Sequence, residues 1–222
     1  MNKIPIYFFP GMISNSLIFE KIELDHNLFT PVFFEWLPVE KNQSLEEYSN
    51  RYIEMINHPN PVLIGVSLGG IIAQEIAKKI KVRKTIIISS VRSTKEYPWL
   101  YRFAKYTKLY RLLPTNNING LIEFLSNRSK KSKREERKAL YDRYLTERSK
   151  DYIDWCIDQV MHWKQTEAIE NVIQIHGDKD EIFPIKNIKN ALVVKGGTHA
   201  MILTKYNWFN TQLPNIIQTN AI

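Results

Sequence analysis

Hydrophobic residues along the chain fall into short runs that are separated by stretches of helical periodicity. Six runs have the length and the β-branched or aromatic character of strands. They are residues 4–9, 31–36, 61–66, 84–89, 172–176 and 190–194. The fourth run reads Lys-Thr-Ile-Ile-Ile-Ser, and its nearly continuous hydrophobicity is typical of a strand buried on both faces of a parallel sheet.

Helices are predicted between these runs. Ser44 with Glu47 three residues later forms a capping-box pattern, which opens a helix that ends at about Asn57. Residues 68–80 predict a second helix with a strongly apolar face, and the residues after about 203 predict a closing helix. Strands that alternate with helices predict an α/β fold, with a doubly wound, mostly parallel six-stranded sheet and helices on both faces.

The stretch 92–165 breaks this alternation. It shows helical patterns without a strand, and it holds 12 of the 26 aromatic residues in about a third of the length. We interpret it as a helical cap inserted between the fourth and fifth strands. The core domain is then made of residues 1–91 and 166–222.

A Gly-x-Ser-x-Gly pattern, Gly65-Val66-Ser67-Leu68-Gly69, joins the third strand to the helix that follows it. A nucleophilic serine needs this arrangement, because a sharp strand-to-helix turn projects its hydroxyl above the sheet and glycines two residues away avoid clashes. The competing interpretation is a glycine-rich turn that binds phosphate. The Gly-Lys-Ser/Thr of a Walker A loop and a Gly-x-Gly-x-x-Gly motif are both missing from the sequence.

With this serine motif in its strand–helix context, nearly the whole chain resembles the α/β-hydrolase superfamily. The sequence Phe8-Phe9-Pro10-Gly11-Met12 resembles the family's oxyanion loop, although Pro10 stands where the family commonly has His. The resemblance implies that the backbone N–H groups of Met12 and Leu68 hold the oxyanion, where negative charge develops in the transition state. A plain strand-ending turn remains the alternative for this loop.

The resemblance also implies an acid and a base. The loop from His176 to Pro184 is similar to the family's acid loop, whose spacing selects Asp180 over Asp178; Glu96, after the fourth strand, is a further candidate. Gly196-Gly197-Thr198-His199 resembles the histidine loop, and His199 takes the last place in the order Ser, Asp, His. These residues predict a Ser67–His199–Asp180 triad.

The predicted function is hydrolysis of a carboxylic ester or thioester through an acyl-enzyme on Ser67. An acyltransferase on the same triad is the alternative, followed by a non-catalytic receptor or scaffold on this fold. No cofactor is implied, and the histidines and acids lack metal-ligand spacing, so no metal is expected. Cys156 is the only cysteine, which excludes an internal disulfide, and we interpret it as a packing residue.

The formal net charge of +8 lies wholly in the predicted cap, where 17 Lys and Arg face 9 Asp and Glu. This excess fits a solvated helix face, an acidic acyl carrier or acyl-CoA, or, as a third interpretation without a reader motif, nucleic acid. Most cap aromatics are expected to form the cap's own core. Trp99, Phe103 and Tyr106 are the candidates for lining a substrate pocket.

No apolar segment reaches the roughly 18 to 20 residues that a membrane span needs, so no membrane partner is expected. The first eleven residues contain one Lys and a short apolar run without a small-residue cleavage site. This pattern predicts a first strand rather than a signal peptide, and hence a cytoplasmic protein.

Overall fold

A computed structural model describes residues 3–115, 143–145 and 149–219 of the chain. Its centre is one six-stranded sheet in the order β2-β1-β3-β4-β5-β6, in which every neighbouring pair is parallel. The strands are β1 (Ile4–Phe9), β2 (Phe29–Phe33), β3 (Val62–Val66), β4 (Lys84–Ile88), β5 (Val172–Gly177) and β6 (Leu192–Val194). The predicted sheet is therefore confirmed, with all of its pairs parallel.

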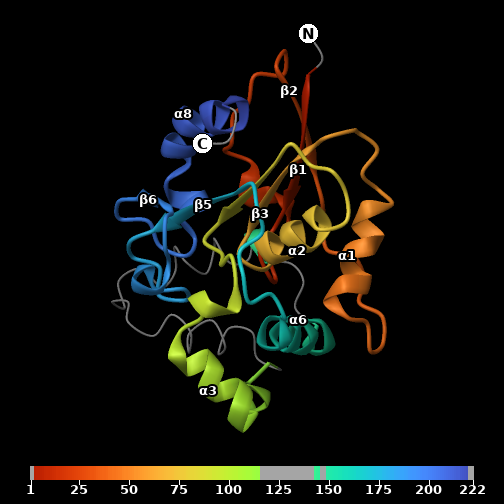
Figure 1. The fold of residues 1–222 in the computed structure, drawn as a ribbon, viewed down its shortest axis with the longest axis vertical. Helices are drawn as coiled ribbons and strands as arrows, with labels where there is room; N and C mark the ends of the chain where they lie inside the picture. Colours follow the sequence, from red (N-terminus) through yellow and green to blue (C-terminus); the bar gives the residue numbers. More distant parts are fainter. Residues whose placement is uncertain (1–2, 116–142, 146–148, 220–222) are drawn as a thin grey trace.

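Helices cover both faces of the sheet (Figure 1). Side chains alternate along β1, so Tyr7 and Phe9 join one buried cluster while Ile6 and Phe8 join the other. The first cluster packs against α1 (Leu45–Ile53) and α2 (Leu68–Ala77). The second packs against α7 (Met201–Thr204) and α8 (Tyr206–Gln218). Side chains on the two faces of β1 thus belong to two separate layers of the core, one on each side of the sheet.

The helix boundaries follow local chemistry. Ser44 caps α1, because its hydroxyl oxygen accepts from the Glu47 N–H at 3.2 Å and the Glu47 carboxylate accepts from the Ser44 N–H at 2.8 Å. The helix ends at Ile53, four residues before the predicted end. Short 3₁₀ turns complete the chain: η1 (Ser16–Phe19), η2 (Thr94–Glu96), η3 (Leu109–Leu112) and η5 (Ile185–Asn187).

In the described parts of the segment 92–165, the regular structure is helical, apart from a single bridge between Leu145 and Ser14. They include α3 (Trp99–Thr107) and α6 (Lys150–His162), which lie at the end of the molecule opposite the N-terminus (Figure 1). Residues 116–142 and 146–148, with the basic run 127–138, lie outside the described residues. The division into core and cap therefore stays a prediction.

Across the described ranges, no helix is both long enough and apolar enough to traverse a bilayer.

Candidate active site

Ser67 lies on the sharp turn between β3 and α2. Its backbone has φ 52° and ψ −119°, a strained combination for a residue with a side chain. A Cβ on Gly65 would stand 2.2 Å from the Gly69 carbonyl oxygen, and one on Gly69 would stand 2.4 Å from the Phe9 carbonyl oxygen. The turn therefore accommodates only glycine at the positions two residues before and two residues after Ser67, as the sequence pattern predicts.

Strand β4 holds this turn in place. The Ser67 N–H donates to the Ile88 carbonyl oxygen at 2.9 Å, and the Ser90 hydroxyl donates to the Ser67 carbonyl oxygen at 2.7 Å. A strained residue costs on the order of 1–3 kcal/mol and persists only where its surroundings determine it. These two hydrogen bonds hold the backbone of Ser67 in its strained conformation. They involve only backbone atoms of Ser67, so its side chain hydroxyl is left free of the strand pairing.

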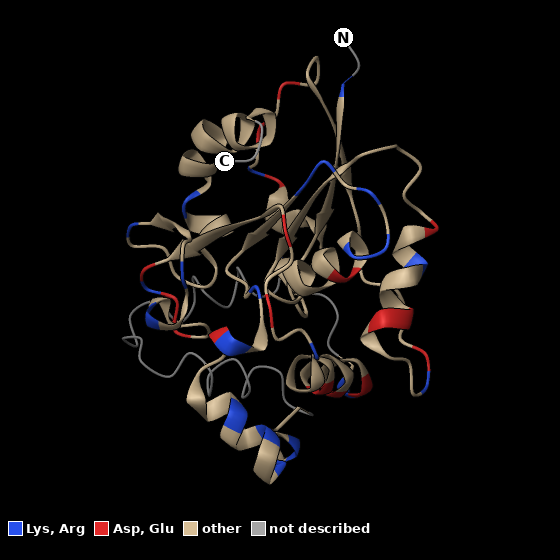
Figure 2. Ribbon diagram, in the orientation of Figure 1, with Lys and Arg blue, Asp and Glu red and all other residues tan. Residues whose placement is uncertain are grey.

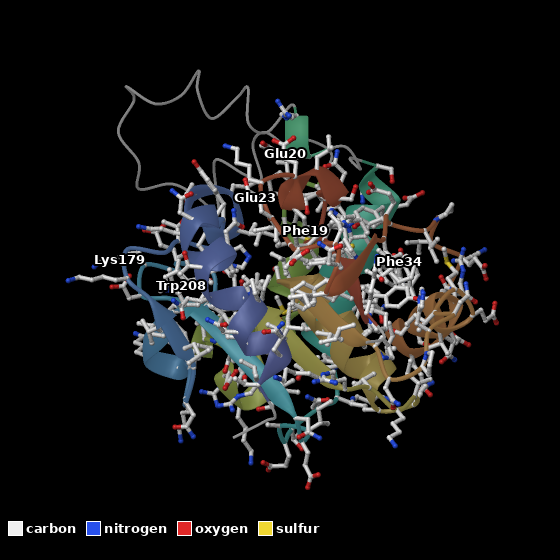
Figure 3. All side chains as sticks on the ribbon, turned by 90° about the horizontal axis from the view of Figure 1, so that it is seen from above. Phe19, Glu20, Glu23, Phe34, Lys179 and Trp208 are labelled. Atoms are coloured by element: carbon white, nitrogen blue, oxygen red, sulfur yellow. The ribbon has the colours of Figure 1, made fainter. Side chains whose placement is uncertain are left out.

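The loops after β5 and β6 touch each other at glycines. A Cβ on Gly177 would lie 2.2 Å from the Gly197 carbonyl oxygen, so the two backbones pass in direct contact. The Lys179 N–H donates to that same oxygen at 2.8 Å, and the Gly196 N–H donates to the Asp178 carboxylate at 2.6 Å. The Lys179 side chain points out of the molecule (Figure 3). This contact brings Asp180 and His199 together.

Ser67, His199 and Asp180 form a continuous hydrogen-bonded path. His199 Nδ1 lies 2.9 and 3.1 Å from the two carboxylate oxygens of Asp180, and its Nε2 lies 3.0 Å from Ser67 Oγ. Because a carboxylate can only accept, Nδ1 carries the proton and Nε2 is free to accept from the serine hydroxyl. The three residues named from the sequence are thus adjacent, and this arrangement can activate a hydroxyl.

Asp180 is buried, with 4% of its surface exposed. Burial raises the pKa of this carboxyl, but the charge and hydrogen bond of His199 and the Phe183 N–H outweigh it, so the pKa lies below its ordinary value. The Ile182 and Phe183 N–H groups both donate to Oδ1 at 2.9 Å. The acid is therefore held ionised and oriented toward His199.

A second histidine lies behind the acid. His176 is fully buried, and its Nε2 donates to the Phe183 carbonyl oxygen at 2.7 Å and lies 3.4 Å from Asp180 Oδ2. The Phe183 ring stands 5.8 Å from the His199 ring, measured between centroids. Phe183 thus contacts both His176 and His199.

The loop after β1 lies against Ser67, since a Cβ on Gly11 would be 3.6 Å from Ser67 Cβ. The Gly11 carbonyl oxygen accepts from Trp36 Nε1 at 2.9 Å, from Ser14 Oγ at 2.8 Å and from the Ser14 N–H at 3.1 Å. Three donors fix the plane of the Gly11–Met12 peptide, whose N–H points away from its carbonyl. Within the described residues, neither the Met12 nor the Leu68 N–H has a protein acceptor.

The loop is also tied to the segment predicted as the cap. The Ile13 N–H donates to the Tyr152 hydroxyl of α6 at 3.4 Å, and the Asn15 N–H donates to the Tyr144 carbonyl oxygen at 3.0 Å. Trp36 packs edge-on against the same Tyr152 ring, with 5.4 Å between centroids. Trp36 was missed from the sequence, although it ends the run predicted as the second strand and such strand ends meet at one edge of a parallel sheet.

Three other predicted residues lie apart from this cluster. Trp99, Phe103 and Tyr106 are 67%, 48% and 89% exposed on α3. The α3 side chain that reaches toward the site is instead Tyr101, whose ring lies 5.9 Å from that of Phe183. The placement therefore gives no support to a pocket lined by the three exposed rings.

The remaining candidates have structural partners. Glu96 is buried and accepts hydrogen bonds from the Arg92 N–H and the Gln174 amide, at 2.7 and 2.9 Å. Cys156 is buried in the core. The part of the chain that the structure describes contains no cluster of three or more His, Cys, Asp or Glu suited to a metal ion.

The parallel sheet, the strained serine after β3 and the loop order Ser, Asp, His define the α/β-hydrolase fold, so the fold that the sequence resemblance implies is confirmed. The sequence profile of the "Uncharacterised protein family (UPF0227)" matches residues 19–98. No curated protein sequence matches the chain significantly.

Solved structures agree on the fold. The chain is similar to a hydrolase from Pseudomonas aeruginosa, with a TM-score of 0.72, 12% identity and coverage of 98% of this chain and 91% of that one. It is similar to a thermophilic esterase from Thermogutta terrifontis (TM-score 0.69, 12% identity, coverage 97% and 91%). A bromoperoxidase from Bacillus anthracis is also similar (TM-score 0.68, 16% identity, coverage 98% and 93%). These neighbours carry different activities, so the reaction has to be argued from the site.

Proposed function

We propose that the protein is a serine hydrolase that cleaves carboxylic esters. The observation that carries the proposal is the path from Asp180 through His199 to Ser67, with hydrogen-bond distances of 2.9 and 3.0 Å. A nucleophile, a base within reach of it and a third group that orients the base are the parts that acyl transfer requires.

The reaction follows from these positions. His199 Nε2 takes the Ser67 proton while Oγ attacks the ester carbonyl, and the Met12 and Leu68 N–H groups hold the oxyanion that forms. When the tetrahedral intermediate collapses, the alcohol leaves and takes a proton from His199. Water, deprotonated by the same imidazole, then releases the acid and restores Ser67. Throughout, the ionised Asp180 stabilises the imidazolium and keeps its tautomer.

The Thermogutta esterase supports an ester as the substrate class by analogy of fold, and the Pseudomonas hydrolase supports hydrolysis in general. A thioester carbonyl is attacked by the same steps with a thiol as leaving group. Transfer of the acyl group to an alcohol instead of water uses the same acyl-enzyme. The first experiment therefore has to separate these outcomes.

The test uses a fluorophosphonate probe and a panel of p-nitrophenyl esters and acyl thioesters of varied chain length. We expect the probe to label Ser67, and we expect Ser67→Ala to abolish both labelling and turnover. Ser16→Ala is the matched control, because that hydroxyl donates to the Glu35 carboxylate and not to a histidine. An adduct on another residue, or turnover that survives in Ser67→Ala, would refute the assignment. Product analysis with an added alcohol distinguishes hydrolysis from acyl transfer.

A further inference from the structure

Helix α3 turns its large apolar side chains toward solvent. Trp99, Phe103 and Tyr106 recur at intervals of four and three residues, so they form one stripe, and the Trp99 and Phe103 rings pair at 6.2 Å. Leu100, Leu109 and Leu112 extend the exposed apolar surface, with 54%, 47% and 78% exposure. No α3 residue is fully buried. A helix of a water-soluble protein ordinarily buries such a stripe, so this face is suited to a partner.

Helix α3 and the turn after it carry charge of one sign. Residues 97–115 contain four basic residues, Arg102, Lys105, Lys108 and Arg111, and no Asp or Glu. Arg102 and Lys105 lie on α3, Lys108 caps its end and Arg111 lies in η3. Figure 2 shows basic residues on α3 and in the segment after it, at the end of the molecule opposite the N-terminus. The side chains of Arg102 and Lys105, on the same helix as the aromatic stripe, are exposed. A partner that is complementary to this face therefore has both an apolar region and negative charge.

The inner side of α3 is linked to the proposed site. Tyr101 packs on Phe183 at 5.9 Å between ring centroids, and Phe183 packs on His199 at 5.8 Å. Ala104 packs against the same core cluster. The Phe183 ring alone thus lies between Tyr101 of α3 and the His199 ring, so a partner bound to α3 is close to the proposed base.

We propose that α3 is a docking surface for an anionic lipid membrane. Aromatic and leucine side chains next to Lys and Arg are the composition of helices that lie in the headgroup region, where the rings enter the acyl boundary and the cations meet anionic lipids. Surface docking needs no spanning helix, so it differs from the spans that the sequence excludes. Resting on the proposed function, the substrate class is then an ester held in the lipid phase.

The test is co-sedimentation of the full chain with vesicles of phosphatidylcholine alone and of phosphatidylcholine mixed with phosphatidylglycerol. We expect binding to the anionic vesicles, weakened by salt. Arg102→Glu with Lys105→Glu should lower the partition coefficient by roughly fivefold or more for each charge. Lys186→Glu with Lys189→Glu, also exposed, is the matched control and should bind as the wild type does.

The apolar contribution has its own readout. Tryptophan emission should shift to the blue on anionic vesicles, and Trp99→Phe should remove the shift while most of the binding persists. Trp99→Ala with Phe103→Ala and Tyr106→Ala should lower partitioning by more than about tenfold. The matched apolar control is Leu192→Ala with Val193→Ala, which alters two exposed side chains of β6.

Equal partitioning of wild type and Arg102→Glu/Lys105→Glu would overturn the proposal, as would equal binding to neutral and anionic vesicles. Binding only to an acidic acyl carrier protein, or a monomer–dimer change in the aromatic triple variant without vesicle binding, would overturn it in favour of those partners. The proposed chemistry is tested separately. Ser67→Ala should bind vesicles normally, and Arg102→Glu/Lys105→Glu should hydrolyse a soluble short ester at the wild-type rate.

Discussion

The indole N–H of Trp36 donates a hydrogen bond to the carbonyl oxygen of Gly11, with 2.9 Å between nitrogen and oxygen. That carbonyl belongs to the peptide whose nitrogen is Met12. A hydrogen bond to one end of a peptide fixes its plane and polarises its N–H, so Trp36 orients the proposed oxyanion donor without touching substrate. It is a positioning residue, and its contribution should appear in the transition state.

Trp36→Phe should therefore lower kcat by roughly tenfold while KM changes little, because removal of a whole oxyanion donor costs about 10² to 10³. Steady-state kinetics on a soluble ester measures both parameters. Trp208→Phe, on α8 at the other side of the sheet, is the control that should leave them unchanged (Figure 3). A rise in KM alone would indicate that Trp36 shapes the binding of substrate instead.

Asp180→Asn should lower kcat by about 10³-fold or more, since an amide cannot stabilise the imidazolium and favours the wrong tautomer. Asp178→Asn is the matched variant two residues away. The Asp178 side chain accepts from the Gly196 N–H, and an asparagine oxygen can keep that bond, so only a small change is expected. A large loss in Asp178→Asn with normal Asp180→Asn would reverse the assignment of the acid.

The depressed pKa of Asp180 also predicts how stability responds to acid. The folded pKa lies below the ordinary value of 3.8, so the ionised group stabilises the native state above that value, and this contribution is lost as the pH falls through the folded pKa. Urea unfolding of wild type and Asp180→Asn should differ most near neutral pH, and the gap should narrow below about pH 4. A constant difference across this range would contradict the prediction.

Close packing at the turn predicts a contrast between two glycines. Gly69→Ala brings a Cβ to 2.4 Å from two backbone oxygens, those of Phe9 and Pro10, so unfolding should become easier by about 1–3 kcal/mol or more. Gly11→Ala meets its nearest atom at 3.5 Å, an ordinary contact, and its stability should change by less than about 1 kcal/mol. The denaturant midpoints of the two variants measure these changes in the free energy of unfolding. An equal loss of stability in both variants would refute the packing argument.

The sequence alone determined the elements that local chemistry controls. Strand β1 spans the predicted residues 4–9, and the capping box of Ser44 and Glu47 is formed. The turn at Ser67 could be predicted for the same reason. The hydrophobic period and the glycine spacing are properties of a few consecutive residues, and they limit φ and ψ directly. The alternation of strands and helices then restricted the topology to a parallel sheet.

Tertiary structure decided what depends on approach between distant segments. Spacing favoured Asp180, but only the contact of Gly177 with Gly197 sets its carboxylate against His199 and leaves Asp178 on the Gly196 N–H. No local pattern pointed from Trp36 to Gly11. The sequence offered Trp99, Phe103 and Tyr106 as pocket candidates without showing which way they face, because a helix has the same period whether its apolar side meets the core or the solvent.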